Sequence, residues 1–155
     1  MARTYGARMG LITFTGDFAK TFLAVWLGRT LGGDYGALLA GVFCQFGHCW
    51  PVYFGFRGGK GVAAGAAMVL FVDWRVFLVL AAVFLVTFLL FRTISISSLL
   101  SALTLPFAFW FLRPGNMIYL ILGVFLACMI CFTHRANIRR IFRGEEKKFT
   151  LKKNT

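Results

Sequence analysis

The residues with the clearest chemical potential lie in one short segment rich in glycine and positive charge. Residues 55–61 read Gly-Phe-Arg-Gly-Gly-Lys-Gly. Glycines let a backbone approach a ligand closely and aim N–H groups at it, and two cations beside them suit a phosphate. The nucleotide-binding P-loop is excluded, because Val62 follows the last glycine where that motif needs serine or threonine. A loop of positive charge that only orients a membrane protein is the alternative. The predicted phosphate ligands are Arg57, Gly58, Gly59, Lys60 and Gly61.

Three further ionisable residues stand in apolar surroundings before this segment. Asp17 and Lys20 are three residues apart, so a helix places them on one face, within reach of each other. Charges at membrane depth are costly and usually pair, so we expect an ion pair that either locks helix packing or presents Lys20 to an anion. His48 precedes Pro51, where a helix should kink or end. We expect His48 to be a structural residue or a support for the phosphate site.

Two polar groups occur later in the chain. Arg92 is followed by Ser95 and Ser98, one helical turn apart, which we assign to a ligand, although serine in a membrane helix commonly bonds to its own helix. His134 and Asn137 follow the last apolar run. Together they could position a hydroxyl and accept its proton, whereas the alternative is a polar helix lying on anionic lipid.

The composition indicates an all-α polytopic membrane protein. Of the 155 residues, 59% are hydrophobic and only 14% are charged. The apolar runs approach the roughly 20 residues that a helix needs to cross a bilayer. Residues 1–9 look like the end of a loop, and no cleavable signal peptide is evident behind them. We expect a single domain over residues 1–155. The predicted spans lie near 10–31, 35–56, 60–72, 76–91, 93–112 and 117–133.

The positive charge predicts how the chain is oriented. The net charge is +12, and many cations fall in the tail at 135–155, which favours cytoplasmic anchoring beside anionic lipid over nucleic-acid binding. The apolar run at 60–72 is short, so it could either cross the membrane or turn back within it as a re-entrant segment. Crossing places the basic loop, Arg92 and the tail on one side, as the positive-inside rule favours. We therefore expect a single polar pocket at the cytoplasmic face.

The cysteines give little sign of a metal site. Cys128 and Cys131 with His134 have the spacing of half a zinc site, but no second ligand pair stands out. Cys44 and Cys49 lie in apolar surroundings, where buried thiols are the default. No metal is predicted.

Taken in order, these motifs resemble the PlsY family, the bacterial membrane glycerol-3-phosphate acyltransferases that use acyl phosphate. The resemblance covers essentially the whole chain and is specific because four separate motifs occur in the same order. The residues that carry it lie at 17–20, at 47–63, at Arg92, Ser95 and Ser98, and from His134 to Gly144 and Glu145.

The resemblance implies transfer of an acyl group from acyl phosphate to the 1-position hydroxyl of glycerol 3-phosphate, giving lysophosphatidic acid and phosphate. It implies no cofactor, a multi-pass location in the bacterial cytoplasmic membrane with the C-terminus cytoplasmic, and contact with the enzyme that makes acyl phosphate. His134 and Asn137 would orient the hydroxyl, while Lys20, Arg92 and the basic loop would hold phosphates. A small phosphate or anion transporter is the alternative function, and a membrane scaffold is a third.

The sequence departs from the family at its beginning. The family's first motif, Gly-Ser-Gly-Asn-x-Gly-Ala-Thr-Asn, is absent together with the span before it, so a serine and an asparagine of the family's reaction centre are missing. Arg3 aligns just behind the place where the motif ends, and we expect it to contact substrate phosphate. Family members have seven spans, so six with both ends inside are expected here.

Overall fold

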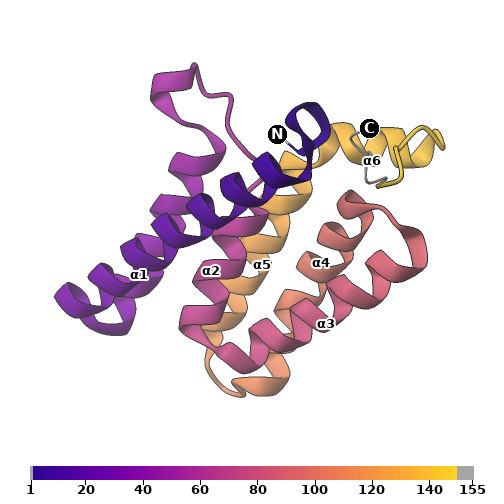
Figure 1. The fold of residues 1–155 in the computed structure, drawn as a ribbon. Coiled ribbons are helices and arrows are strands. Elements are labelled where there is room, and N and C mark those ends of the chain that lie inside the picture. Colours follow the sequence, from indigo (N-terminus) through magenta and orange to yellow (C-terminus); the bar gives the residue numbers. More distant parts are fainter. Residues whose placement is uncertain (1, 150–155) are drawn as a thin grey trace. The chain divides into compact units, whose positions relative to one another are not determined.

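The computed structural model describes the backbone of residues 2–149 and the side chains of residues 8–149. Over these residues the chain is helical, with six α-helices and one short 3-10 helix (Figure 1). The described residues fall into two compact units, an N-terminal unit ending at Val72 and a C-terminal unit from Asp73 to Phe149. The predicted contact of Arg3 with phosphate lies outside the described side chains.

The first helix, α1 (Ala2–Cys49), folds back on itself. Lys20 Nζ lies 3.1 Å from His48 Nδ1 although the residues are 28 apart in sequence, a separation of about 42 Å along a straight helix. The reversal occurs at Gly33, whose φ of +62° is a left-handed conformation that favours glycine. α1 is therefore a hairpin of two antiparallel arms, as its course in Figure 1 shows.

Small residues allow the two arms to approach closely beside the turn. A Cβ at Gly28 would collide with the carbonyl oxygen of Gly36 and lie 2.6 Å from the Cβ of Ala40. A Cβ at Gly36 would collide with the carbonyl oxygen of Gly28 in turn. Close backbone contact of this kind is how membrane helices associate when lipid gives them no hydrophobic driving force.

The short helix α2 (Val62–Val72) completes the N-terminal unit and packs on α1. Gly41 of α1 leaves the space that Met68 occupies, because a Cβ there would lie 2.6 Å from the methionine sulfur. Ala64 and Ala67 are completely buried. The small side chains thus set α2 close to its neighbours.

The C-terminal unit contains α3 (Trp74–Phe91), α4 (Ile94–Leu112), α5 (Met117–Thr133) and α6 (Arg135–Phe142). Consecutive helices contact one another along the chain. The core of the unit includes Phe109, which stacks on Tyr119 with a ring separation of 5.7 Å.

Asp73 ties the beginning of α3 to the end of α4. Its side chain is only 1% exposed and accepts hydrogen bonds from the backbone N–H and the guanidinium of Arg75 and, at 2.6 Å, from Nε of Arg113. The Arg113 guanidinium also lies 5.0 Å from the ring centre of Tyr119 on α5. Burial alone would raise the pKa of Asp73, but the bonds from Arg75 and Arg113 outweigh it and hold the pKa well below its usual range.

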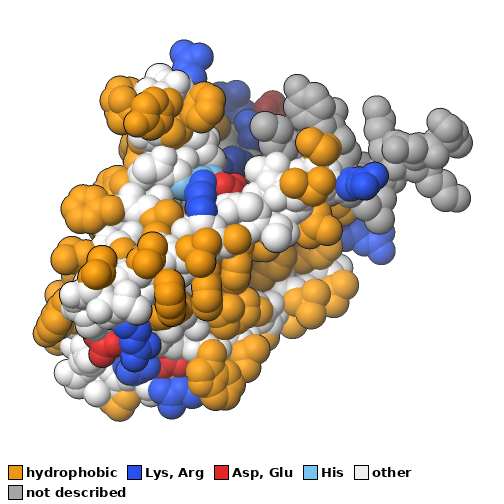
Figure 2. All heavy atoms as spheres, turned by 60° about the vertical axis from the view of Figure 1, so that its left-hand side comes forward, with side chains coloured by type: hydrophobic (Ala, Val, Ile, Leu, Met, Phe, Trp, Pro, Cys, Tyr) orange, Lys and Arg blue, Asp and Glu red, His pale blue; other side chains and the backbone are white. Residues whose placement is uncertain are grey.

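The helices have the length and apolarity of membrane spans. Among the described residues, three stretches, Arg8–Phe54, Trp74–Phe91 and Ile94–Leu112, are long and apolar enough to cross a membrane, and α5 with α6, bent by 65°, gives a fourth when the bent pair is counted as one span. Hydrophobic side chains cover much of the visible surface, and charges gather in a few groups (Figure 2). The all-α membrane class is therefore confirmed, whereas the number of six spans stays a prediction.

Two boundary predictions were wrong. Residues 1–9 were expected to be the end of a loop, but α1 begins at Ala2. The predicted span 35–56 ends earlier, at Cys49, because Pro51 has no N–H to continue the helix. The chain then forms the 3-10 turn Val52–Phe54.

The substitution Asp73→Asn is expected to lower the free energy of unfolding by about 3 kcal/mol, because it leaves two arginines facing a neutral side chain. Thermal unfolding in detergent measures the change. Asp34→Asn is the matched control, because Asp34 is 68% exposed and lies 3.5 Å from Arg29, so its loss should change stability little. Equal changes in the melting temperature of the two variants would contradict the proposed role of Asp73.

Candidate functional site

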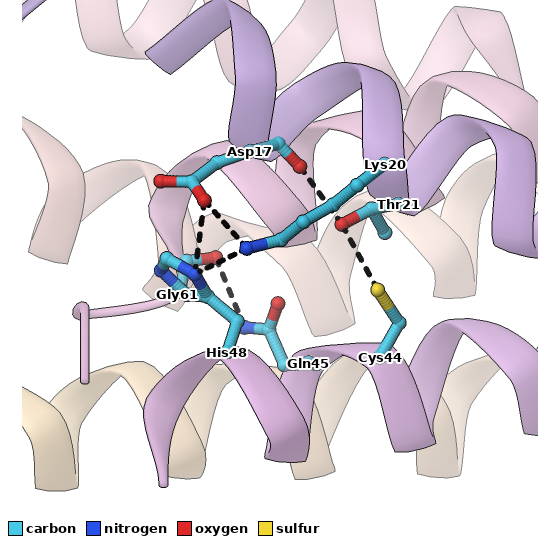
Figure 3. A network of polar contacts seen from close by, with 7 residues as sticks. All are labelled: Asp17, Lys20, Thr21, Cys44, Gln45, His48 and Gly61. Carbon is cyan, nitrogen blue, oxygen red and sulfur yellow. Dashed lines mark hydrogen bonds and ion pairs between the residues drawn. The ribbon is translucent and has the colours of Figure 1, made fainter. Parts of the chain in front are cut away.

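Three ionisable side chains meet between the two arms of α1, and we call Asp17, Lys20 and His48 the arm cluster. Lys20 Nζ donates to Asp17 Oδ1 at 2.5 Å, which confirms the predicted pair, and lies 3.1 Å from His48 Nδ1. His48 Nδ1 also lies 3.3 Å from Asp17 Oδ1, so the same ring nitrogen faces both the ammonium group and the carboxylate. Figure 3 shows Asp17 and Lys20 facing His48 across the hairpin.

The arm cluster leaves its cation accessible. The Lys20 side chain is 47% exposed, whereas that of Asp17 is 20% exposed and that of His48 is 11% exposed. Below Asp17, the hydroxyl of Thr21 donates to the Asp17 backbone carbonyl and lies 3.3 Å from the sulfur of Cys44. The cluster therefore presents an ammonium group whose position is fixed by a carboxylate and an imidazole.

The basic glycine loop, residues 55–61, folds back onto the end of α1. The N–H of Gly58 donates to the carbonyl of Cys49, and the N–H of Gly59 donates to the carbonyl of His48, both at 3.1 Å. These bonds cap carbonyl groups that a helix leaves unpaired at its end. The N–H groups of Gly58 and Gly59 are thus used within the fold, and their role in phosphate binding stays a prediction.

The glycines of the loop are needed for close packing on α1. A Cβ at Gly58 would collide with the backbone oxygen of His48, and a Cβ at Gly59 would collide with the His48 ring. Gly61 has a φ of +80°, and a Cβ there would collide with the amide of Gln45. The loop thus holds the exposed side chains of Arg57 and Lys60 on a backbone anchored beside the arm cluster.

The C-terminal unit contains a second polar group, which we call the carboxylate cluster: Ser95, Asn137, Arg140 and Glu146. The Glu146 carboxylate accepts from the Ser95 hydroxyl at 2.7 Å, from the Asn137 amide at 2.8 Å and from Arg140 Nε at 2.8 Å. Asn137 Nδ2 also donates to the Ser95 hydroxyl at 2.7 Å. The segment after α6 is thereby bound to the beginning of α4.

Glu146 is ionised in this setting. Its side chain is only 3% exposed, and this burial would favour the protonated form. The hydrogen bonds from Arg140, Ser95 and Asn137 outweigh the burial and lower the pKa of Glu146 to about 2.

His134 and Asn137, the predicted catalytic pair, are both buried at the junction of α5 and α6. His134 Nδ1 lies 2.9 Å from the backbone oxygen of Ile130. A carbonyl oxygen can only accept, so Nδ1 carries the hydrogen and the lone pair of the neutral ring lies on Nε2. His134 therefore has the tautomer that a base acting through Nε2 requires.

The other predicted ligands of this unit have different settings. The Ser98 hydroxyl donates to the backbone carbonyl of Ile94 in its own helix. This is the alternative that the sequence left open, and it does not favour a role for Ser98 as a ligand. Arg92 ends α3 with a φ of +50°, and its carbonyl accepts from the N–H of Phe149 at 2.7 Å. Its side chain is exposed.

The sequence patterns did not predict two residues that make prominent contacts, Gln45 and Glu146. Gln45 is a polar residue inside an apolar run, one turn before His48, which was a usable signal. Glu146 neighbours Glu145, and only the structure distinguishes the buried Glu146 from the exposed Glu145. The four cysteines are free thiols, and among the described side chains no group of three or more His, Cys, Asp or Glu is placed to hold a metal ion.

The comparison with protein families gives a match over most of the chain. Residues 1–144 match the family model described as glycerol-3-phosphate acyltransferase. A glycerol-3-phosphate acyltransferase of Pseudomonas paraeruginosa is 40% identical over 151 residues, covering 96% of this chain and 78% of the relative. The enzyme of the same name from Laribacter hongkongensis is 37% identical over 150 residues, covering 94% of this chain and 74% of the relative.

Solved structures agree with this match. The chain resembles the crystal structure of PlsY (YgiH), an integral membrane glycerol 3-phosphate acyltransferase, in its glycerol 3-phosphate form, with a TM-score of 0.88 and 30% identity. That alignment covers 96% of this chain and 75% of the other. The lysophosphatidic acid form of the same protein matches with a TM-score of 0.86 over 97% of this chain and 77% of the other.

The substitution Glu146→Gln is expected to lower the free energy of unfolding by about 2–4 kcal/mol, because it removes the buried charge that Ser95, Asn137 and Arg140 share as donors. Thermal unfolding measures the loss, and Glu145→Gln, which changes an exposed neighbour, should leave stability nearly unchanged.

The same carboxylate predicts a pH dependence. Because the folded pKa of Glu146 is lowered from 4.5 to about 2, its contribution to stability is complete above 4.5 and is lost as the pH falls towards 2. The difference in melting temperature between the wild-type chain and Glu146→Gln should therefore narrow across this range. A constant difference would show that the charge is not what stabilises the cluster.

Proposed function

Since the chain belongs to the glycerol-3-phosphate acyltransferase family, we propose that it transfers an acyl group from acyl phosphate to the 1-position hydroxyl of glycerol 3-phosphate. The products would be lysophosphatidic acid and phosphate. The observation that carries this proposal is the match, over 96% and 97% of the chain, to a protein solved in a glycerol 3-phosphate form and a lysophosphatidic acid form. Lysophosphatidic acid is what acylation of glycerol 3-phosphate yields.

Acyl phosphate is a fitting donor because it is a mixed anhydride and already activated. The glycerol hydroxyl oxygen would attack the acyl carbon, forming the ester bond as the bond from that carbon to the phosphate oxygen breaks. The hydroxyl proton would pass to a base, and the electron pair of the broken bond would leave on inorganic phosphate. This chemistry requires neither a covalent enzyme intermediate nor coenzyme A.

The phosphates of both substrates need cations, and the arm cluster and the glycine loop supply Lys20, Arg57 and Lys60, all of them exposed. Lys20 is fixed by Asp17 and His48, while Arg57 and Lys60 extend from the anchored glycine loop. Fixed charges cost no reorganisation when negative charge develops on a leaving phosphate. We assign these cations, together with Arg92, to phosphate binding.

His134 and Asn137 would act on the acceptor hydroxyl. The tautomer of His134 places a lone pair on Nε2, as a general base needs. Asn137 and Ser95 are held by Glu146, so their polar groups are preorganised. We further propose that the protein lies in the bacterial cytoplasmic membrane with its C-terminus cytoplasmic, and receives acyl phosphate from the enzyme that makes it.

The test is an acyl-transfer assay with the purified chain in detergent, with palmitoyl phosphate or palmitoyl-coenzyme A as the donor and glycerol 3-phosphate as the acceptor. We expect lysophosphatidic acid only with palmitoyl phosphate, with one phosphate released for each product molecule. Lys60→Ala should reduce turnover roughly a hundredfold if the lysine stabilises the leaving phosphate. Glu145→Ala, which removes a charge from an exposed side chain, should not reduce turnover.

The alternative outcomes are distinct. Product from palmitoyl-coenzyme A alone would refute the proposed donor. Phosphate flux into sealed vesicles without any acyl transfer would instead identify an anion transporter. Full turnover in His134→Ala would exclude His134 as the base and leave the substrate's own phosphate to take the proton.

A further inference from the structure

Gln45 has a polar atom that the fold does not satisfy. It lies on the second arm of α1 and is only 1% exposed. Its Nε2 donates to the carbonyl of Gly61 at 3.0 Å. Its Oε1, although buried, has no hydrogen-bond partner among the side chains and backbone groups that the structure describes.

This arrangement is unfavourable for stability alone. A buried acceptor without a donor bears the full cost of leaving water, which can exceed what one hydrogen bond returns. Methionine has nearly the same shape and would avoid that cost, while the carbonyl of Gly61 would still accept from the N–H of Gly65. An unsatisfied oxygen that persists in such a place calls for an explanation, and a donor from a ligand provides one.

The surroundings of Gln45 indicate which ligand could supply that donor. Gln45 is one helical turn before His48, so both side chains lie on the face of α1 that meets Lys20 and Asp17. In Figure 3 the amide nitrogen of Gln45 points to Gly61 and its oxygen is turned toward the first arm. Gly61 directly precedes α2, and its φ of +80° with the tight fit on Gln45 fixes this junction.

We propose that Oε1 of Gln45 accepts a hydrogen bond from a hydroxyl of a polyol phosphate whose phosphate group is bound by Lys20. This inference rests on the proposed function and deepens it by naming a residue that recognises the glycerol part of the substrate. It assigns to Gln45 two bonds on one amide, one to the loop and one to the ligand. Gln45 would thus couple the position of the glycine loop to the presence of the correct substrate.

The proposed ligand contact is specific for a hydroxyl. A phosphate dianion offers only acceptor oxygens and would repel Oε1, whereas a hydroxyl can donate to it. A site that holds a buried acceptor rejects analogues that lack the hydroxyl, because binding them leaves the acceptor unpaired. Selectivity for glycerol 3-phosphate over a phosphate ester without hydroxyls is therefore the property that Gln45 should control.

The experiment compares glycerol 3-phosphate with n-propyl phosphate, which keeps the chain length and the phosphate but lacks both hydroxyls. Binding of each to the full chain in detergent is measured by isothermal titration calorimetry. We expect the wild-type chain to prefer glycerol 3-phosphate by tenfold or more, the effect of one well-made hydrogen bond. Gln45→Met should reduce that preference at least fivefold and leave the affinity for n-propyl phosphate within about twofold.

The matched control is Thr21→Val, which removes another buried polar atom of the hairpin. Thr21 is completely buried, but its hydroxyl already donates to Asp17, so its loss should leave the ratio of the two affinities unchanged. A wild-type chain that binds both compounds equally would overturn the inference, whether or not Gln45→Met folds. A preference that persists in folded Gln45→Met would overturn it as well.

This test separates the inference from the proposed reaction. Hydroxyl selectivity that depends on Gln45 in a chain that transfers no acyl group would refute the reaction and keep the binding role. Acyl transfer by a chain without such selectivity would keep the reaction and refute the role of Gln45.

Discussion

The close contact between the two arms of α1 is the constraint on which the N-terminal unit depends. Gly28 and Gly36 let the backbones approach until neither position can hold a side chain. Lys20 and Asp17 are thereby brought within 3.3 Å of a histidine near the other end of the same helix. In lipid, such close packing takes the place of the hydrophobic effect, so it both stabilises the hairpin and assembles the arm cluster.

The polar side chains in these apolar helices stabilise the fold and organise the candidate site through the same contacts. The glycine loop caps the end of α1 with the N–H groups of Gly58 and Gly59. These backbone donors are thus used for structure, while the cationic side chains of Arg57 and Lys60 are exposed at the surface. In the C-terminal unit, Glu146 likewise holds Ser95 and Asn137 in fixed positions. Preorganisation of this kind lowers the cost of binding charged substrates.

Local patterns in the sequence predicted the features that depend on near neighbours. The spacing of Asp17 and Lys20 predicted their ion pair, and the apolar runs predicted an all-helical membrane protein. Sequence reasoning failed where residues far apart in the chain decide the outcome. No local pattern reveals that Gly59 bonds to His48, or that Glu146 and not Glu145 reaches Ser95. These contacts exist only after the helices pack.

We propose that the α1 hairpin builds a phosphate site around Lys20. Calorimetric titration of the wild-type chain with glycerol 3-phosphate, in parallel with Lys20→Met and Lys147→Met, tests it most directly. Lys147→Met removes the same charge from an exposed position of the basic tail. We expect Lys20→Met to weaken the binding of glycerol 3-phosphate roughly tenfold or more, and Lys147→Met to bind as the wild-type chain does. Equal affinity of all three proteins, or no binding by the wild-type chain, would contradict it.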